Sequence, residues 1–325
     1  MDFRLALYEL AAQHRLDAQA TQKLQQLAAL NREPASLAYW LPRGIAVLGA
    51  AIGGLGIIFW IAANWDTLGR FWRFALLQSF FVVMCLGALW RPAARTPLGL
   101  LALLAIGGLF AYFGQTYQTG ADPWQLFAIW AVLALPLCLG VRSDVLWTPW
   151  ALVVMAAISL WIVAHTGHRW RVEASDFSIH MIGWGAALLL TFALSAALQK
   201  FTGAGPWALR TALTLTTLMI MATALGGLFQ QEIAAHYWLG LVVLILAAGA
   251  LASPGLFEVY GLSVASLALN TLIVSGLGHA WLTGSDGDAI GALLLLGLVA
   301  AALLAATVSS IMRLSRHYQA PREPA

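Results

Sequence analysis

The sequence predicts an all-α protein: a polytopic transmembrane bundle of about ten helices, preceded by a short amphipathic cytoplasmic helical pair. Of its 325 residues, 61% are hydrophobic and only 10% are charged, whereas soluble domains carry about 25% charged residues. The apolar residues form successive runs of about 17–25, each long enough to cross roughly 30 Å of hydrocarbon. Fifteen Trp residues agree with this class, because indole rings favour the water–lipid boundary. The composition excludes a soluble enzyme, a disordered chain and a secreted disulfide scaffold.

Residues 1–40 differ from the rest of the chain, because acidic and basic residues alternate there and no apolar run is long enough to span lipid. Apolar residues recur at helical spacing in two segments: Phe3, Leu7 and Leu10, then Leu24, Leu27 and Leu30. Asp17 is placed to cap the second helix. We therefore expect a cytoplasmic amphipathic helical pair over residues 1–40. Acidic residues near its start argue against a signal peptide.

The apolar runs predict a transmembrane domain over residues 41–312, followed by a basic cytoplasmic tail over residues 313–325. Lipid offers no partner to backbone polar groups, so each run is expected to be a helix. The short connections predict that consecutive helices pack antiparallel. The predicted spans are 44–65, 70–90, 97–114, 123–141, 144–165, 178–198, 206–229, 236–252, 256–281 and 288–311.

The positive charges predict the orientation in the membrane. With the N-terminus inside, 13 of the 17 Lys and Arg residues lie on the cytoplasmic side, as the positive-inside rule requires. We therefore expect a multi-pass protein of a bacterial inner membrane with both termini in the cytoplasm. The outer set is Arg70, Arg73, Arg169 and Arg171.

Two short matches have the spacing of a duplicated four-helix unit. Gly107–Phe110 reappears as Gly226–Phe229, and Trp60–Asn64 is echoed by Trp161–His165. Matches of this length also arise readily in a chain rich in Leu, Ala and Gly. We favour this second interpretation, and the four-helix repeat stays the alternative.

No catalytic, metal or cofactor signature is present in the sequence. Cys85 and Cys138 both lie in apolar runs, which argues against a disulfide or a thiolate site. Ser263 and His279 are sixteen residues apart on one predicted helix, about 24 Å at 1.5 Å per residue, and cannot form a dyad. We expect no catalytic residues, no metal and no cofactor, and enzymatic activity is disfavoured. The Lys and Arg at span ends also argue against a nucleic-acid partner.

The densest polar stretch follows the third predicted span. Asp122 and Gln125 are explained as the N-cap and capping-box residues of the next helix. The uncharged residues that remain extend an apolar helix, where they either bond another helix or line a wet mouth. We slightly favour the interpretation that these residues bond another helix over the interpretation that they face a ligand. These residues are Gln115, Thr116, Tyr117 and Gln118.

A second polar cluster, Asn64 and Trp65, ends the first span. Trp65 is explained by the interface, whereas Asn64 has no such simple structural explanation. Deeper polar residues are few, namely Gln78, His180 and Asn270. No acidic or basic residue lies at the centre of a predicted span, which argues against an ion-driven pump.

The first half of the chain carries five short motifs: GIIFWIAANW at 56–65, GGLF at 107–110, GQTY at 114–117, GADPWQLF at 120–127 and LALP at 133–136. Together they resemble the bacterial membrane proteins grouped as domain of unknown function 2157. The resemblance covers about residues 1–145, and the helical pair before the first span also fits it. It implies a polytopic inner-membrane protein and brings no activity, substrate or site residue.

Two hypotheses about function follow. In the first, the protein is a carrier or binding protein for a neutral or lipid-like small molecule, because uncharged polar and aromatic groups suit such a ligand. Its site would lie at the outer mouth and comprise Asn64, Trp65, Gln115, Tyr117 and Gln118. The alternative is a non-catalytic assembly or sensing subunit that docks on a protein partner through residues 1–40. In both, the lipid bilayer is a partner.

Overall fold

The computed structural model describes residues 9–10, 12–14, 16–27, 35–64, 69–117, 120, 122–168, 171–284 and 289–319. The described residues are helical or lie in turns, and none of them forms a strand. The all-α prediction is therefore confirmed. The chain divides into two compact units, Met1–Ile52 and Gly53–Ala325.

The first unit contains helix α2 (Ala18–Leu27) and the first part of α3 (Ala35–Ala63). The backbone N–H of Ala20 donates to the Asp17 carboxylate at 2.6 Å, so the predicted cap of this helix is confirmed. The predicted helix around Phe3 and Leu7 lies outside the described residues.

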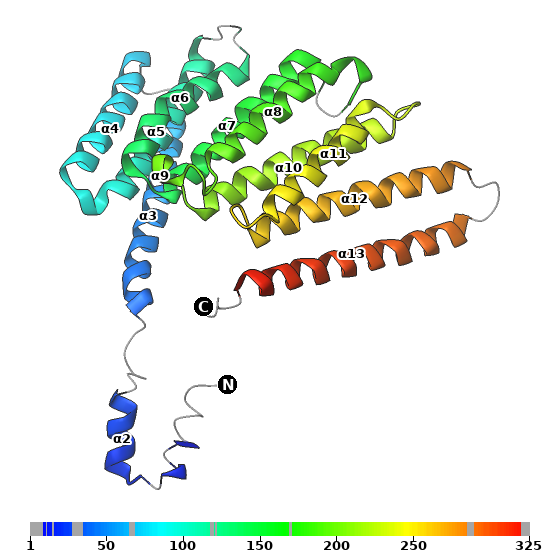
Figure 1. The fold of residues 1–325 in the computed structure, drawn as a ribbon. Coiled ribbons are helices and arrows are strands. Elements are labelled where there is room, and N and C mark those ends of the chain that lie inside the picture. The colour runs from blue at the N-terminus through cyan, green and yellow to red at the C-terminus, as the bar shows by residue number, and fades with distance from the viewer. Residues whose placement is uncertain are drawn as a thin grey trace. The chain divides into compact units, whose positions relative to one another are not determined.

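The second unit is built from long helices that are arranged side by side in the order of the sequence (Figure 1). After α3, each long helix packs against the next one along the chain, and α5 also contacts α7. The short α9 and the 3₁₀ turns Pro92–Ala94 and Ala174–Asp176 lie in the connections. The helices are α4 (Arg70–Trp90), α5 (Arg95–Tyr117), α6 (Pro123–Val141), α7 (Asp144–Thr166), α8 (Phe177–Ala193), α9 (Gln199–Thr202), α10 (Pro206–Leu228), α11 (Ala235–Leu251), α12 (Val259–Gly284) and α13 (Ala289–Gln319).

Each of the ten predicted spans corresponds to one long helix. In the described residues, nine helices are long and apolar enough to cross a membrane, and the apolar α11 is slightly shorter at 17 residues. Three boundaries differ from the prediction by five residues or more. Helix α3 begins at Ala35, nine residues before the predicted span and within the segment predicted as the cytoplasmic helical pair. Helix α8 ends at Ala193 and a turn replaces the last residues of span 178–198. Helix α13 continues to Gln319, so the first basic residues of the predicted tail belong to this helix.

Helix α10 is the centre of the second half of the bundle, because it contacts α7, α8, α11 and α12. Its buried residues Ile220, Ala224 and Leu228 form one core with Trp184 of α8 and Leu244 of α11. Small residues allow the close approach: a Cβ at Gly240 would lie 2.6 Å from that of Ala224. The core is thus made by side chains from several helices around α10.

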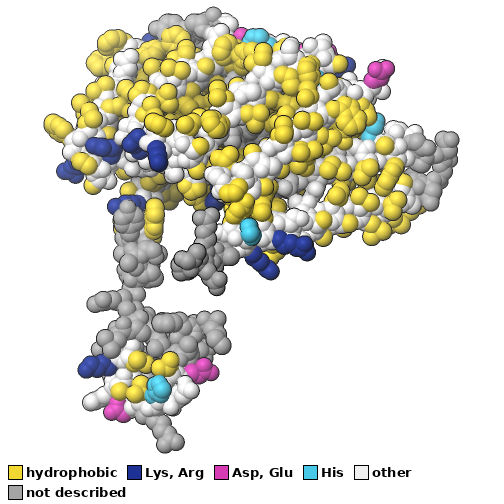
Figure 2. Space-filling view, in the orientation of Figure 1, with side chains coloured by type: hydrophobic (Ala, Val, Ile, Leu, Met, Phe, Trp, Pro, Cys, Tyr) yellow, Lys and Arg dark blue, Asp and Glu magenta, His cyan; other side chains and the backbone are white. Residues whose placement is uncertain are grey.

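Large apolar side chains remain exposed on most of the long helices. Phe71, Trp90 and Ile290 are 75%, 89% and 74% exposed, and Figure 2 shows hydrophobic side chains spread over the visible face of these helices. A soluble protein rarely exposes so extensive an apolar surface. The helix lengths and this surface identify a membrane protein whose helices contact the lipid bilayer.

The positive charges of the second unit gather at one end of its helices. Seven described Lys and Arg residues lie at the end where α4 meets α5 and α11 meets α12, against three at the other end. Tyr318 confirms that α13 returns to the first end, because its hydroxyl donates to the Ala252 carbonyl at 3.0 Å. The seven are Arg91, Arg95, Arg142, Lys200, Arg210, Arg313 and Arg316, and the three are Arg70, Arg73 and Arg171.

Candidate functional site

The residues predicted for an outer mouth are only partly described. Trp65 and Gln118 lie outside the described residues, and Tyr117 is described as the last residue of α5 without its side chain. Gln115 is exposed on α5. The Asn64 side chain donates to the Trp60 carbonyl of its own helix at 2.9 Å. The ends of α3 and α5 that carry Asn64 and Gln115 lie on the same side of the bundle, and a site between them stays a prediction.

The predicted capping residues of α6 occupy the expected positions. Asp122 is the N-cap of this helix with an extended backbone, and its carbonyl accepts from the Gln125 N–H at 3.0 Å. The Asp122 side chain, however, makes no capping hydrogen bond to the described residues. The Asp122 residue is exposed.

The isolated polar residues of the spans have structural roles. The Asn270 amide of α12 donates to the Thr307 hydroxyl of α13 at 3.1 Å, and Ser263 donates to the carbonyl of Val259 in its own helix at 2.7 Å. Gln78 is exposed on α4. His180 differs, because it is buried and its Nδ1 lies 3.2 Å from Nε2 of His236 in α11.

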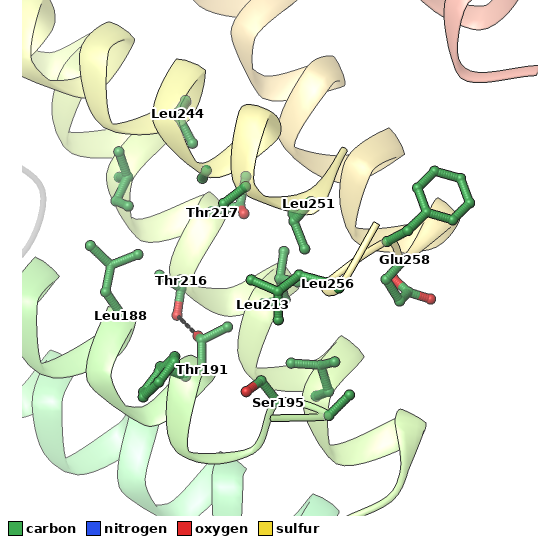
Figure 3. A pocket seen from close by; sticks show the side chains of 18 residues that line it. Leu188, Thr191, Ser195, Leu213, Thr216, Thr217, Leu244, Leu251, Leu256 and Glu258 are labelled. Atoms are coloured by element: carbon green, nitrogen blue, oxygen red, sulfur yellow. Dashed lines mark hydrogen bonds between the residues drawn. The ribbon is translucent and has the colours of Figure 1, made fainter. Parts of the chain in front are cut away.

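An apolar cavity of about 240 Å³ lies between α8, α10, α11 and the connection from α11 to α12 (Figure 3). Leu188, Leu213, Leu244 and Leu251 line it, and these side chains come from three helices. The turn that ends α8 closes one side of the cavity. The sequence predicts no site here, because the lining is mostly apolar and resembles the rest of the spans.

Some polar side chains that line the cavity have hydrogen-bond partners, whereas the Ser195 hydroxyl has none among the described residues. The Thr191 and Thr216 hydroxyls lie 3.0 Å apart and also bond the carbonyl of Ala187. The Ser195 side chain is different: it is only 8% exposed, and its hydroxyl has no hydrogen-bond partner among the described residues. A buried hydroxyl without a partner costs roughly 1–3 kcal/mol, so Ser195 is the unsatisfied polar group in the lining of this cavity.

Among the described residues that line this cavity, Glu258 supplies the carboxylate, and its charge is neutralised. Glu258 accepts from Nε and Nη2 of Arg210 at 3.1 and 3.0 Å, and from the backbone N–H of Gly261. The Arg210 guanidinium also lies 5.5 Å from the ring centroids of Trp207 and Tyr260. Because this charge is paired, the rest of the lining consists of hydrocarbon and hydroxyl groups.

A second polar cluster lies at the opposite end of the helices, where α7 connects to α8. His168 Nε2 lies 3.0 Å from Asp176 Oδ2, and both residues precede the buried pair of His180 and His236. The Nδ1 atom of His236 has no partner among the described residues. An open cavity of about 770 Å³ extends from this cluster between α7 and α10. Its apolar lining comes from these two helices.

Sequence reasoning singled out only His180 from this cluster. The spacing of His168, Glu173 and Asp176 within one short connection was the signal that could have identified it. No sequence signal distinguishes Ser195, because its exposure and missing partner depend on the turn after α8.

Residues 8–147 match the model of a family described as "Predicted membrane protein (DUF2157)". The match confirms the resemblance seen in the first half of the chain. It ends at the beginning of α7, so the apolar cavity and the histidine cluster both lie beyond the matched residues. No curated protein and no solved structure matches the chain.

Proposed function

We propose that this integral membrane protein, whose N-terminal part matches that family, binds a neutral lipid-like molecule in the apolar cavity between α8, α10 and α11. The observation that carries the proposal is the Ser195 hydroxyl, which is buried against this cavity without a partner. An apolar pocket with a few polar groups is the usual form of a small-molecule site. A ligand with a hydrocarbon chain and a hydroxyl, ester or amide head satisfies both features.

The electrostatics favour an uncharged ligand. Arg210 already neutralises Glu258 at the rim, and a second charge in the cavity would lack a partner. A buried charge without a partner is strongly unfavourable. The volume of about 240 Å³ is slightly below the roughly 300–1,000 Å³ of drug-sized sites, so the cavity suits one chain or one end of a larger lipid.

The proposal moves the site away from the outer mouth that the sequence predicts. The cavity lies at the end of the bundle that carries seven of the described positive charges, and we propose that this end faces the cytoplasm. The site around Asn64 and Gln115 at the other end stays a prediction. Docking of a protein partner through residues 1–40 also stays a prediction.

The test is photolabelling of the purified full-length protein with a long-chain fatty alcohol that carries a diazirine. Wild type should be labelled at peptides of α8, α10 or α11, and an excess of unlabelled alcohol should compete. Ser195→Ala removes the hydrogen-bond partner and should weaken competition by about 1 kcal/mol, or about fivefold. Ala247→Phe places a ring in the cavity and should abolish this labelling.

Leu246→Phe is the matched control, because Leu246 precedes Ala247 on α11 and is 67% exposed. Its labelling should equal that of wild type. Equal labelling of wild type, Ala247→Phe and Leu246→Phe would show that the probe samples only the lipid-facing surface, and the proposal would be wrong.

A further inference from the structure

Three side chains with metal-binding atoms converge in the connection between α7 and α8. A donor atom from each of His168, Glu173 and Asp176 lies within 4.8 Å of the other two. We propose that these three residues bind a divalent transition-metal cation of the Zn²⁺ type. The site is independent of the apolar cavity, since it lies at the other end of the helices.

The connection that carries these residues is fixed by its neighbours. Gly167 ends α7 with a φ of 75°, a left-handed conformation that glycine adopts without strain. The Thr166 hydroxyl then lies 3.1 Å from the His168 carbonyl. Further along, the Gln230 amide donates to the Val172 carbonyl. The backbone on both sides of the donors is therefore held against the helices.

Asp176 is turned toward His168 although its position favours another role. It is the N-cap residue of α8, where a carboxylate usually accepts hydrogen bonds from the first N–H groups of the helix. Its side chain makes no such bond to the described residues and instead lies 3.0 Å from His168 Nε2. Asp176 therefore does not stabilise the start of α8 with its side chain, and contacts the imidazole nitrogen of His168 instead.

The donor set selects the class of cation. One imidazole nitrogen and two carboxylate oxygens suit Zn²⁺, whereas Mg²⁺ and Ca²⁺ prefer oxygen ligands alone. Zinc bonds of about 2.0–2.2 Å place tetrahedral donors about 3.3 Å apart. His168 Nε2 and Asp176 Oδ2 lie 3.0 Å apart, a hydrogen-bond distance, so these two donors would separate by a few tenths of an ångström to bind zinc. The three donor atoms lie within 4.8 Å of one another, so the Glu173 carboxylate would move toward the other two donors.

The negative charges and the partial burial of the donors favour the binding of a cation. The side chains of Asp176, His168 and Glu173 are 12%, 29% and 41% exposed, so the Asp176 carboxylate is the most desolvated of the three donors. Among the described residues, Arg171 forms an ion pair with Glu173: its Nε lies 3.3 Å from the Glu173 carboxylate and its side chain is 78% exposed. Such an exposed pair contributes little, and a divalent cation would neutralise both carboxylates.

The surroundings leave a fourth coordination position open. His168 lines the open cavity between α7 and α10, as do Arg171 and His180. Three protein ligands with a water or an external ligand in the fourth position is the arrangement of an open zinc site. A cation held here would therefore be reached from the cavity.

The test uses full-length protein purified without a polyhistidine tag, stripped with EDTA and titrated with Zn²⁺ by calorimetry. Wild type should bind about one Zn²⁺ per chain and show a rise in Tm on zinc addition that EDTA reverses. His168→Gln and Asp176→Asn should each weaken zinc binding at least roughly tenfold. Glu173→Gln changes the most exposed donor, so it tests the site with the least risk to folding.

His317→Gln is the control, because His317 is exposed on α13 at the other end of the helices. It should bind zinc as wild type does. A rise in Tm that is equal in wild type and all three donor variants, or the absence of zinc binding by wild type, would overturn the proposal. If His168→Gln lowers the Tm of the metal-free protein while zinc has no effect on wild type, the contact with Asp176 is a structural ion pair only.

Discussion

At the residue scale, Asp144 shows how one carboxylate can join distant parts of a membrane protein. The sequence predicts it at the start of a helix, where its charge complements the dipole, and it is indeed the first residue of α7. Its oxygens, however, accept from the N–H groups of Gly205, Trp207 and Ala208 at 3.0, 2.7 and 3.0 Å. The carboxylate therefore caps α10 and fixes its beginning against α7.

We expect Asp144→Ala to destabilise the protein by about 1–3 kcal/mol, because three N–H groups at the start of α10 lose their acceptor. Asp144→Asn keeps one acceptor oxygen and should have a smaller effect. Ser143→Ala is the comparison, since Ser143 is the N-cap of α7 and its hydroxyl accepts a single long bond of 3.4 Å from Val145, so its loss should cost less than the loss of three bonds. Thermal unfolding in detergent measures all three, and equal Tm values for the Asp144 and Ser143 variants would contradict this role.

At the element scale, most bounds of the helices could be predicted, whereas the hydrogen-bond partners of their polar side chains could not. The predicted spans 70–90 and 123–141 coincide with α4 and α6, because in lipid the length of an apolar run decides the length of the helix. The acceptor of a polar side chain depends instead on tertiary packing. Asp144 reaches residues more than sixty positions away, and the sequence offers no signal for this choice.

The difference between helix bounds, which follow from the sequence, and hydrogen-bond partners, which depend on packing, also explains how much of the candidate sites could be predicted. The sequence correctly indicates that uncharged polar groups are rare in the spans, and Asn270 and His180 were identified on that basis. It could not show that Asn270 is satisfied by Thr307, or that His180 meets His236 from α11. Ser195 is distinctive only because a turn buries it without a partner.

The contact between α12 and α13 gives a prediction at this scale. The Asn270 amide and the Thr307 hydroxyl should couple the two helices by about 0.5–2 kcal/mol, as interhelical hydrogen bonds do in membranes. A double-mutant cycle of Asn270→Leu and Thr307→Val, measured as free energy of unfolding in mixed micelles, gives this coupling. Thr271→Val is the control, because its hydroxyl bonds the carbonyl of Leu267 in its own helix. Strict additivity of the Asn270 and Thr307 variants would contradict the coupling.

At the scale of the whole molecule, the distribution of charge sets the orientation that we propose. The end that carries the apolar cavity also carries seven of the described Lys and Arg residues, and the end with the metal-binding cluster carries three. The positive-inside rule then places the cavity on the cytoplasmic side and the cluster on the outer side.

Labelling of single cysteines tests this orientation in intact cells. In a background where Cys85 and Cys138 are replaced by Ala, Ala174→Cys in the connection from α7 to α8 should react with a membrane-impermeant maleimide. Gly255→Cys, between α11 and α12, should react only after the cells are permeabilised. The reverse pattern would invert the orientation and the sides of both proposed sites.

The central position of α10 has a consequence for biosynthesis. Helices of a membrane protein emerge from the ribosome in chain order, so α7 and α8 reach the bilayer before the helix that both of them contact. Until α10 arrives, the indole N–H of Trp184 lacks the Thr223 hydroxyl that it bonds at 2.9 Å. The native packing of α7 and α8 against α10 can therefore be completed only after α10 has entered the bilayer.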